Sequence, residues 1–247
     1  MALGQSDVDP LEAFRRAKAA AEKAIELEPD DAYAYYNLGI AYGSQGNYTK
    51  AIESFEKAIE LDPDDAGAYY NLGYAYDEQG NYTKAIESYE KAIELKPDYA
   101  DAYYNLGLAY YNQGNYTKAI ESYKKAIELD PDYAFAYNNL GYAYELQGNF
   151  TKAIQLYEKA IELKPDNANA YNNLGNAYYD LGERTKAKKY YQKAIELKPD
   201  LPEIIFNQAL TTEGNNRRFM EIRLYKEAAR LGHQGAQDWL KKNGYDW

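Results

Sequence analysis

The chain of 247 residues lacks cysteine altogether and contains a single histidine, His233. Without cysteine it cannot form disulfides, thiolate nucleophiles, zinc fingers or iron–sulfur clusters. One histidine excludes a multi-histidine metal site, and no glycine-rich phosphate-binding motif occurs in the sequence. We therefore expect no metal, no cofactor and no catalytic residue, and for His233 a surface or tail-packing role.

The chain also lacks long hydrophobic runs and an excess of positive charge. No segment approaches 18 consecutive apolar residues, so we expect no membrane span. The first ten residues lack the basic and apolar regions of a signal peptide, which predicts a cytoplasmic protein. A net charge of -11 disfavours nucleic acid as a partner, because phosphate backbones bind basic surfaces.

The usual core residues are scarce as well. Leu, Ile, Val and Phe together account for 43 of the 247 residues, a fraction typical of disordered chains of high net charge. The alternative is a core built from alanine and from the 30 tyrosines. Residue spacing decides between the two.

Proline and glycine recur at a fixed interval, which indicates an internal repeat. Residues 66–99 and 100–133 differ at 6 of 34 positions. The prolines that mark the 34-residue period are Pro29, Pro63, Pro97, Pro131, Pro165 and Pro199. A disordered chain has no reason to keep such a register, so we expect a folded repeat protein.

Each repeat contains two helix patterns. Apolar residues share one helical face in residues 32–45 and again in residues 48–61. Asn47 is expected to cap the second helix, Pro63 to end it and Asp64 to cap the next first helix. Side chains four residues apart on the second helices predict ion pairs of Glu53 with Lys57, Glu87 with Lys91, and Glu121 with Lys125.

These residues resemble the tetratricopeptide repeat, whose consensus residues fall at the same spacing. The matching residues of the first full unit are Tyr35, Leu38, Gly39, Tyr42, Ala51, Phe55, Ala58 and Pro63. The resemblance implies an all-α solenoid of helix-turn-helix units in a right-handed superhelix. Gly39 and Ala51 would then allow two helices to approach closely.

The predicted organisation has three parts. Residues 1–31 form an N-terminal half-repeat, a single capping helix over residues 10–28 that Asp9 caps. Five units follow at 32–65, 66–99, 100–133, 134–167 and 168–201. Residues 202–247 form a divergent sixth repeat, with helices at 202–212 and 218–231, and a last helix at 236–243. The stretch 228–237 resembles Sel1-like repeats.

The central repeats and the C-terminal end differ in regularity and in charge. Near-identical repeats are typical of an idealised, engineered array or of a recent duplication. Residues 183–247 carry 13 Lys and Arg against 9 Asp and Glu, a net charge of +4, which leaves -15 for residues 1–182. The basic group Lys186, Lys188, Lys189 and Lys193 is either a solvated face or one side of a head-to-tail contact between molecules.

The resemblance also predicts where a ligand would bind. First helices line the groove of tetratricopeptide arrays, and the groove positions here hold repeated asparagines and tyrosines. An asparagine ladder can bind the backbone of an extended peptide, or it can satisfy groups within the repeats. The tyrosines are either binding or packing residues. The predicted groove residues are Asn37, Asn71, Asn105, Asn139, Asn173, Tyr36, Tyr70, Tyr104, Tyr74, Tyr142 and Asp101.

Two functions are compatible with this sequence. The first is a scaffold that binds an extended peptide or a partner helix, neutral to basic because of Asp77, Asp101 and Glu145. A chaperone-tail carboxylate clamp is not expected, since no cation stands at the matching groove positions. The second is an idealised structural scaffold with no dedicated ligand, in which weak head-to-tail self-association joins unlike ends.

Overall fold

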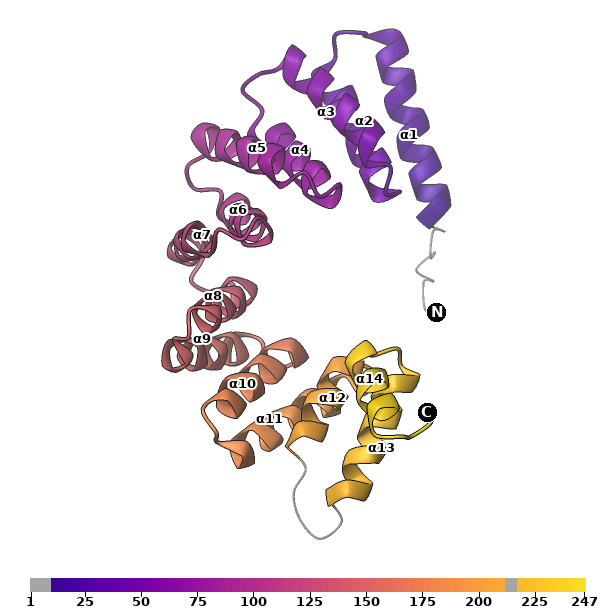
Figure 1. Cartoon of the computed structure of the whole chain (residues 1–247). Coiled ribbons are helices and arrows are strands. Elements are labelled where there is room, and N and C mark those ends of the chain that lie inside the picture. Colours follow the sequence, from indigo (N-terminus) through magenta and orange to yellow (C-terminus); the bar gives the residue numbers. More distant parts are fainter. Residues whose placement is uncertain (1–9, 212–216) are drawn as a thin grey trace, which may run out of the picture. The chain divides into compact units, whose positions relative to one another are not determined.

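The computed structural model describes residues 10–211 and 217–247, which form fourteen helices and no strand (Figure 1). The chain divides into two compact units, residues 1–129 and 130–247. Unit 1 contains α1 Pro10–Leu27, α2 Ala32–Ser44, α3 Tyr48–Leu61, α4 Ala66–Glu78, α5 Tyr82–Leu95, α6 Ala100–Asn112 and α7 Tyr116–Leu129. Unit 2 contains α8 Ala134–Leu146, α9 Phe150–Leu163, α10 Ala168–Asp180, α11 Arg184–Leu197, α12 Pro202–Leu210, α13 Arg217–Arg230 and α14 Gln234–Lys242.

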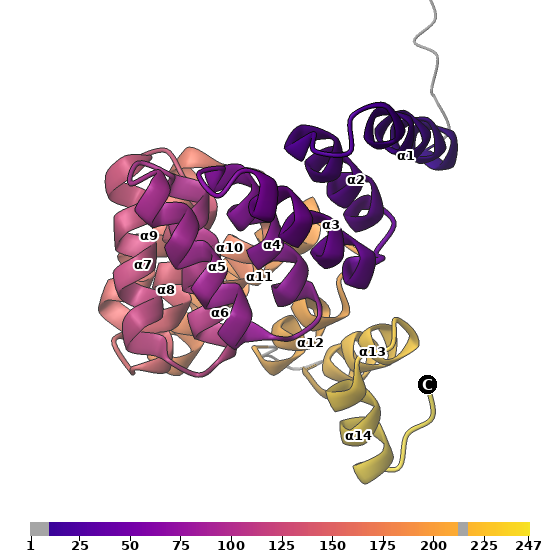
Figure 2. The same ribbon diagram turned by 90° about the horizontal axis from the view of Figure 1, so that it is seen from above.

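Unit 1 is a stack of helix pairs. Each first helix packs on the second helix of its own repeat, and each second helix packs on the next first helix. First helices also contact each other, α2 with α4 and α4 with α6. The single helix α1 lies beside α2 in both ribbon views (Figure 2). The predicted all-α solenoid of helix pairs is therefore confirmed.

Side-chain caps define most helix starts. Asn47 Oδ1 accepts a hydrogen bond from the Lys50 amide at 3.3 Å, which confirms it as the cap of α3. The cap of α4 is Asp65, whose Oδ1 accepts from the amides of Gly67 and Ala68 at 2.8 and 3.2 Å. The prediction of Asp64 was wrong, because that residue lies in the turn and α4 begins only after Asp65. The predicted cap Asp9 lies outside the described residues.

The core depends on glycine–aromatic contacts between paired helices. A Cβ added at Gly39 would lie 2.5 Å from the Phe55 ring, and one at Gly107 would lie 2.6 Å from the Tyr123 ring. Both rings are almost fully buried. A side chain larger than hydrogen therefore does not fit here, which confirms the close approach expected at Gly39.

Exposed ion pairs follow a different spacing from the predicted one. Lys57 pairs with Glu60 at 2.9 Å, three residues on, and Lys91 pairs with Glu94 in the same way. Glu53, the predicted partner of Lys57, lies four residues earlier on the exposed side of α3. The i, i−4 prediction was wrong because Lys57 extends towards the C-terminus of its helix. Such exposed pairs contribute little to stability in either spacing.

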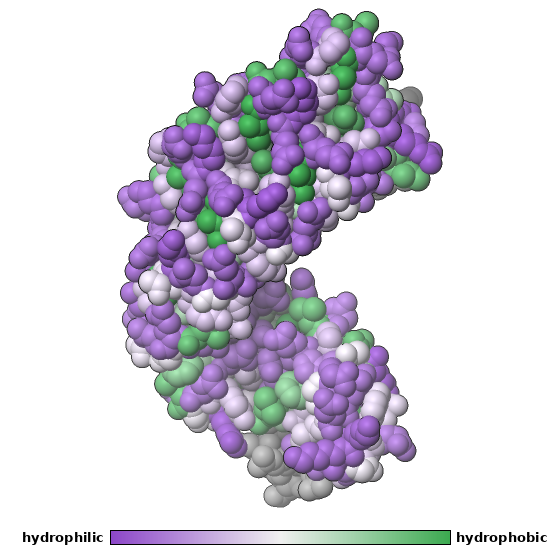
Figure 3. Space-filling view, turned by 45° about the horizontal axis from the view of Figure 1, so that its top comes forward, coloured by the Kyte–Doolittle hydropathy of each residue, from purple (hydrophilic) through white to green (hydrophobic). Residues whose placement is uncertain are grey.

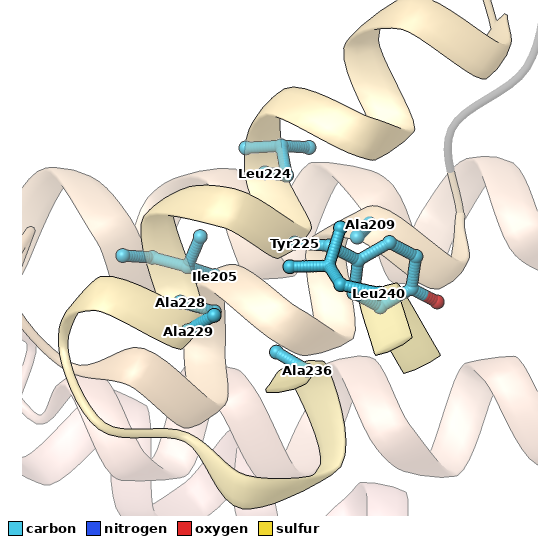
Figure 4. Close-up of a cluster of buried hydrophobic side chains, with 8 residues drawn as sticks. All are labelled: Ile205, Ala209, Leu224, Tyr225, Ala228, Ala229, Ala236 and Leu240. Carbon is cyan, nitrogen blue, oxygen red and sulfur yellow. The ribbon is translucent and has the colours of Figure 1, made fainter. Parts of the chain in front are cut away.

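Unit 2 ends in a core that differs from the repeats. Ile205, Tyr225 and Leu240, from α12, α13 and α14, are buried together and point toward one another (Figure 4). The Trp239 ring stacks on Tyr225 at 4.0 Å between centroids. His233 stacks on Phe206 at 4.3 Å, and its Nδ1 accepts a hydrogen bond from the Ala236 amide at 3.1 Å. His233 thus caps α14 and packs the tail, as expected.

The helix α12 is shorter than the other first helices. It has nine residues, whereas α2 has 13. The predicted end at Thr212 lies outside the described residues, and the helix itself ends at Leu210.

Helix α11 differs from the other second helices at one core position. The exposed Lys188 occupies the repeat position that the buried Ile52 has on α3. A lysine is tolerated there because it remains in contact with solvent.

Candidate functional site

The candidate site is the first-helix face, defined as the second, fifth, sixth, ninth and twelfth residues of each first helix. In unit 1 this face lies on α2, α4 and α6, and it contains a repeated hydrogen bond. Asn71 Nδ2 donates to the Tyr36 hydroxyl at 3.1 Å, and Asn105 Nδ2 donates to the Tyr70 hydroxyl at 2.8 Å. Asn71 Nδ2 also donates to the Gly67 carbonyl at 2.9 Å. The amide nitrogens thus join successive repeats.

The tyrosines of these bonds have a second contact in the core. The Tyr36 ring lies 6.0 Å from Phe55, and the Tyr70 ring lies 5.9 Å from Tyr89. Tyr104 packs on the second helix of its own repeat in the same way. Burial, followed by the Asp101 charge, raises the pKa of Tyr70 to about 12. These tyrosines therefore have a packing role, whatever they contribute to binding.

Other groove residues are more open to solvent. Tyr74 is 44% exposed, Tyr142 is 36% exposed, and Asp101 at the start of α6 is exposed. Tyr74 stands edge-on to Tyr48 at 6.5 Å, and the Tyr48 hydroxyl donates to Glu78 at 3.0 Å. This part of unit 1 combines aromatic surface with negative charge, which suits a cationic or neutral ligand group.

The first-helix face of unit 2 contains an asparagine network instead. Asn173 Nδ2 donates to Asn138 Oδ1 at 3.1 Å, and Asn138 Nδ2 donates to Asn139 Oδ1 at 3.2 Å. The buried Asn207 of α12 donates to Asn172 and Asn176, at 2.9 and 3.1 Å. The predicted groove residues include Asn139 and Asn173, whereas Asn138 and Asn172 lie at predicted groove positions without having been singled out, and Asn207 was not predicted. The 34-residue spacing contains the signal for all three. Asn138 and Asn172 occupy the repeat position of Tyr36 and Tyr70, and Asn207 occupies the repeat position of Asn173.

Two carboxylates at the twelfth position behave differently. The Tyr157 hydroxyl donates to Glu145 Oε2 at 2.7 Å, and burial raises the pKa of Glu145 to about 7. At the same position in unit 1, Asp77 Oδ1 and the Tyr89 hydroxyl are buried without hydrogen-bond partners. Aspartate is one methylene shorter than glutamate and does not reach the tyrosine. Burial, with the charge of Glu78, raises the pKa of Asp77.

Among residues 10–211 and 217–247, no group of three His, Asp or Glu side chains is placed to hold a metal ion. Within the same ranges, no helix is both long and apolar enough to cross a membrane. What the site offers is amide hydrogen bonding, aromatic surface and negative charge.

Comparison with known proteins establishes the family. Tetratricopeptide repeat profiles match residues 11–66, 37–100, 70–134, 104–168 and 168–201, and a Sel1 repeat profile matches residues 222–233. The chain therefore belongs to the tetratricopeptide repeat family, with a Sel1-like segment near its C-terminus. A search of curated protein sequences found no match.

Several solved structures share the fold. The crystal structure of MamA is 36% identical, with a TM-score of 0.62, covering 66% of this chain and 95% of that one. YrrB, described as a TPR protein with an unusual peptide-binding site, is 29% identical, with a TM-score of 0.64 and coverages of 76% and 97%. The Cut9–Hcn1 structure is 21% identical, with a TM-score of 0.77 over 96% of this chain and 49% of that one, and shows the fold alone. The neighbours support a protein-interaction scaffold.

Proposed function

We propose that this protein is an interaction scaffold whose first-helix face binds an extended peptide or a partner helix. The observation that carries this proposal is the fixed orientation of Asn71 and Asn105. Each amide is held through its nitrogen by the preceding repeat, and among the described residues nothing donates to either Oδ1. A preorganised acceptor can bind a peptide N–H without further ordering cost. The peptide-binding site named for YrrB is consistent with this function.

The charge of the face favours a neutral or basic ligand. Glu78 lies beside the exposed Tyr74, so a lysine or arginine could contact both this ring and this carboxylate, and Asp101 adds negative charge near Tyr70. An acidic chaperone tail would be repelled here. The role we propose is binding without catalysis.

The test separates the structural role of the ladder from its binding role. Peptides are first selected on the full protein from an unbiased displayed library, and their affinities are then measured by calorimetry. Tyr70→Phe and Asn105→Ala both remove the Asn105–Tyr70 hydrogen bond, but only Asn105→Ala removes the acceptor Oδ1. We expect Asn105→Ala to weaken binding about tenfold more than Tyr70→Phe does, equivalent to about 1.4 kcal/mol. Equal affinities for the two variants would refute the ladder as a binding element.

End-to-end assembly is the second candidate, favoured by the exposed lysines of α11. Lys188 and Lys189 are exposed on that helix, whereas Asp30 and Asp62 are exposed near the other end of the chain. Opposite charges at unlike ends attract at low ionic strength. Light scattering at low and high salt tests this assembly, and a monomer at every concentration in low salt excludes it.

A further inference from the structure

An open groove lies between α1 and α2, at the end of unit 1. Its volume is about 680 Å³, and α1 contributes Phe14, Ala17, Ala21 and Ala24 to its walls, while α2 contributes Asn37 and Ile40. Ile40 is 43% exposed, a large fraction for an isoleucine on a packed helix. Hydrophobic atoms reach the surface over the N-terminal helices at the top of Figure 3.

The same face is covered by a helix in the repeats that follow. Helix α2 packs on α3 and α4, and α4 packs on α5 and α6. In each case a tyrosine hydroxyl of the covering helix accepts a hydrogen bond from the asparagine of the next first helix, at 3.1 Å for Tyr36 and 2.8 Å for Tyr70. Asn37 has the same position on α2, but no described helix precedes α1. The groove is thus continuous with the stacking surface of the repeats and has the form of a helix site.

The groove differs from its internal counterparts at one position. Ala21 takes the place of Phe55, whose ring lies against Gly39 of the covering helix, and of Tyr89, whose ring lies against Gly73. With alanine at this point, the space of the aromatic ring is left to the groove. A helix bound here must fill that space with a side chain of its own, where the internal repeats have glycine.

Negative charge lies at one end of the groove. A second hollow of about 610 Å³ shares Asp31 and Tyr33 with it and is lined further by Glu28, Asp30 and Asp62. A basic residue, or the positive end of a helix dipole, would be stabilised there. An occupant parallel to α2 would place its N-terminus at this end.

A second copy of this chain is a poor occupant. The described helices are already packed in their own molecule, and the apolar residues of the last helix, Ala236 and Leu240, are buried in its own core. Its exposed residues include Lys241 and Lys242, which do not match an apolar groove.

We infer that the α1–α2 groove binds an amphipathic α-helix of a partner protein, which places a bulky apolar side chain on Ala21 and a tyrosine on Asn37. This groove shares Tyr33, Asn37 and Ile40 of α2 with the first-helix face and extends it onto α1, away from the peptide contacts expected along α4 and α6. The partner is a helix and not an extended peptide, because the groove repeats a face that helices cover elsewhere in the unit.

A bump-and-hole experiment tests this inference on the full chain. The probes are synthetic peptides of residues 66–78, the sequence of α4, with Gly, Ala or Leu at the position of Gly73. Comparing Leu with Ala avoids the helix-propensity penalty of glycine. We expect the Leu peptide to bind about tenfold more tightly than the Ala peptide, because it fills the space over Ala21.

A larger side chain at position 21 of the protein should reverse the preference for the Leu peptide. In Ala21→Phe the ring returns, so the Gly peptide should bind best and the Leu peptide at least tenfold more weakly than the Gly peptide. Ala21→Leu should shift the preference in the same direction, which guards against a folding defect in one variant. The exposed Ala19→Phe is the matched control and should leave all affinities unchanged.

Three results would overturn the inference. The first is failure of the Leu peptide to bind the folded wild-type protein, and the second is an equal effect of Ala19→Phe and Ala21→Phe. The third is a concentration-dependent dimer in sedimentation that Ala21→Phe abolishes, because a second copy would then be the occupant. Tyr74→Ala, which removes a ring of the peptide face on α4, should not alter these affinities and keeps this test distinct from the proposed peptide binding.

Discussion

Tyrosine takes the place of leucine and phenylalanine in this protein because its ring can pack in the core while its hydroxyl forms a hydrogen bond. The ring of Tyr89 or Tyr123 fills the space over a glycine, whereas Tyr36 and Tyr70 add a hydroxyl that accepts an asparagine hydrogen bond. Aliphatic residues would supply only the first function. The scarcity of ordinary core residues is therefore compatible with a well-packed interior.

The glycine–aromatic contacts can be tested with two substitutions of the same kind. In Gly107→Ala the new Cβ would lie 2.6 Å from the Tyr123 ring, so we expect a loss of about 1–3 kcal/mol in the free energy of unfolding. Gly43→Ala is the control, because its nearest neighbour would be Ala51 at 3.9 Å. It should stabilise the helix by about 0.5–1 kcal/mol. Urea unfolding of both variants measures the difference, and similar effects would contradict the account.

Glu145 should make stability depend on pH. Burial raises its pKa to about 7 from an ordinary value of 4.5, so the folded state keeps a proton that the unfolded state loses between these pH values. Stability from this residue is therefore full below pH 4.5 and is lost as the pH rises towards 7 and above. Glu145→Gln keeps an acceptor for Tyr157 without the charge.

We expect Glu145→Gln to stabilise the protein by about 1–2 kcal/mol at pH 8 and to change little at pH 4, after allowing for partial exposure of the residue. Thermal unfolding at the two pH values measures this. A gain of the same size at both would show that charge burial is not the cause.

The repeat period made the helices predictable, while local geometry limited their details. The sequence placed first and second helices and the cap Asn47 correctly. The predicted helix cap at Asp64 was wrong, because the choice between the adjacent Asp64 and Asp65 depends on where the turn ends. The Lys57 ion pair also depended on rotamer direction, which the 34-residue period does not contain.

Capping by asparagine can be tested on one element. Asn81 Oδ1 accepts from the Lys84 amide at 3.3 Å at the start of α5. Asn81→Ala should cost about 1 kcal/mol in the free energy of unfolding. Lys91→Ala on the same helix removes only the exposed pair with Glu94 and should cost less than about 0.5 kcal/mol. Denaturant unfolding ranks the two, and a larger effect for Lys91→Ala would contradict the capping role.

For the molecule as a whole, the fold followed from sequence more fully than the site did. The 34-residue register predicted the solenoid of helix pairs and the family. It did not reveal that Asn71 and Asn105 are bonded to the tyrosines of the preceding repeat, since partners 35 residues apart become visible only when helices are placed. The predicted N-terminal half-repeat implied that α1 lacks a first helix of its own, but the lining of the α1–α2 groove became visible only in the structure.

Ligand binding on the first-helix face is the central property proposed for this protein. Nuclear magnetic resonance of isotopically labelled protein, titrated with a library-selected peptide, tests this claim most directly. In unit 1 we expect amide and side-chain shifts to concentrate on α4 and α6, around Asn71, Tyr74 and Asn105. Shifts confined to the second helices α5 and α7 would contradict the claim.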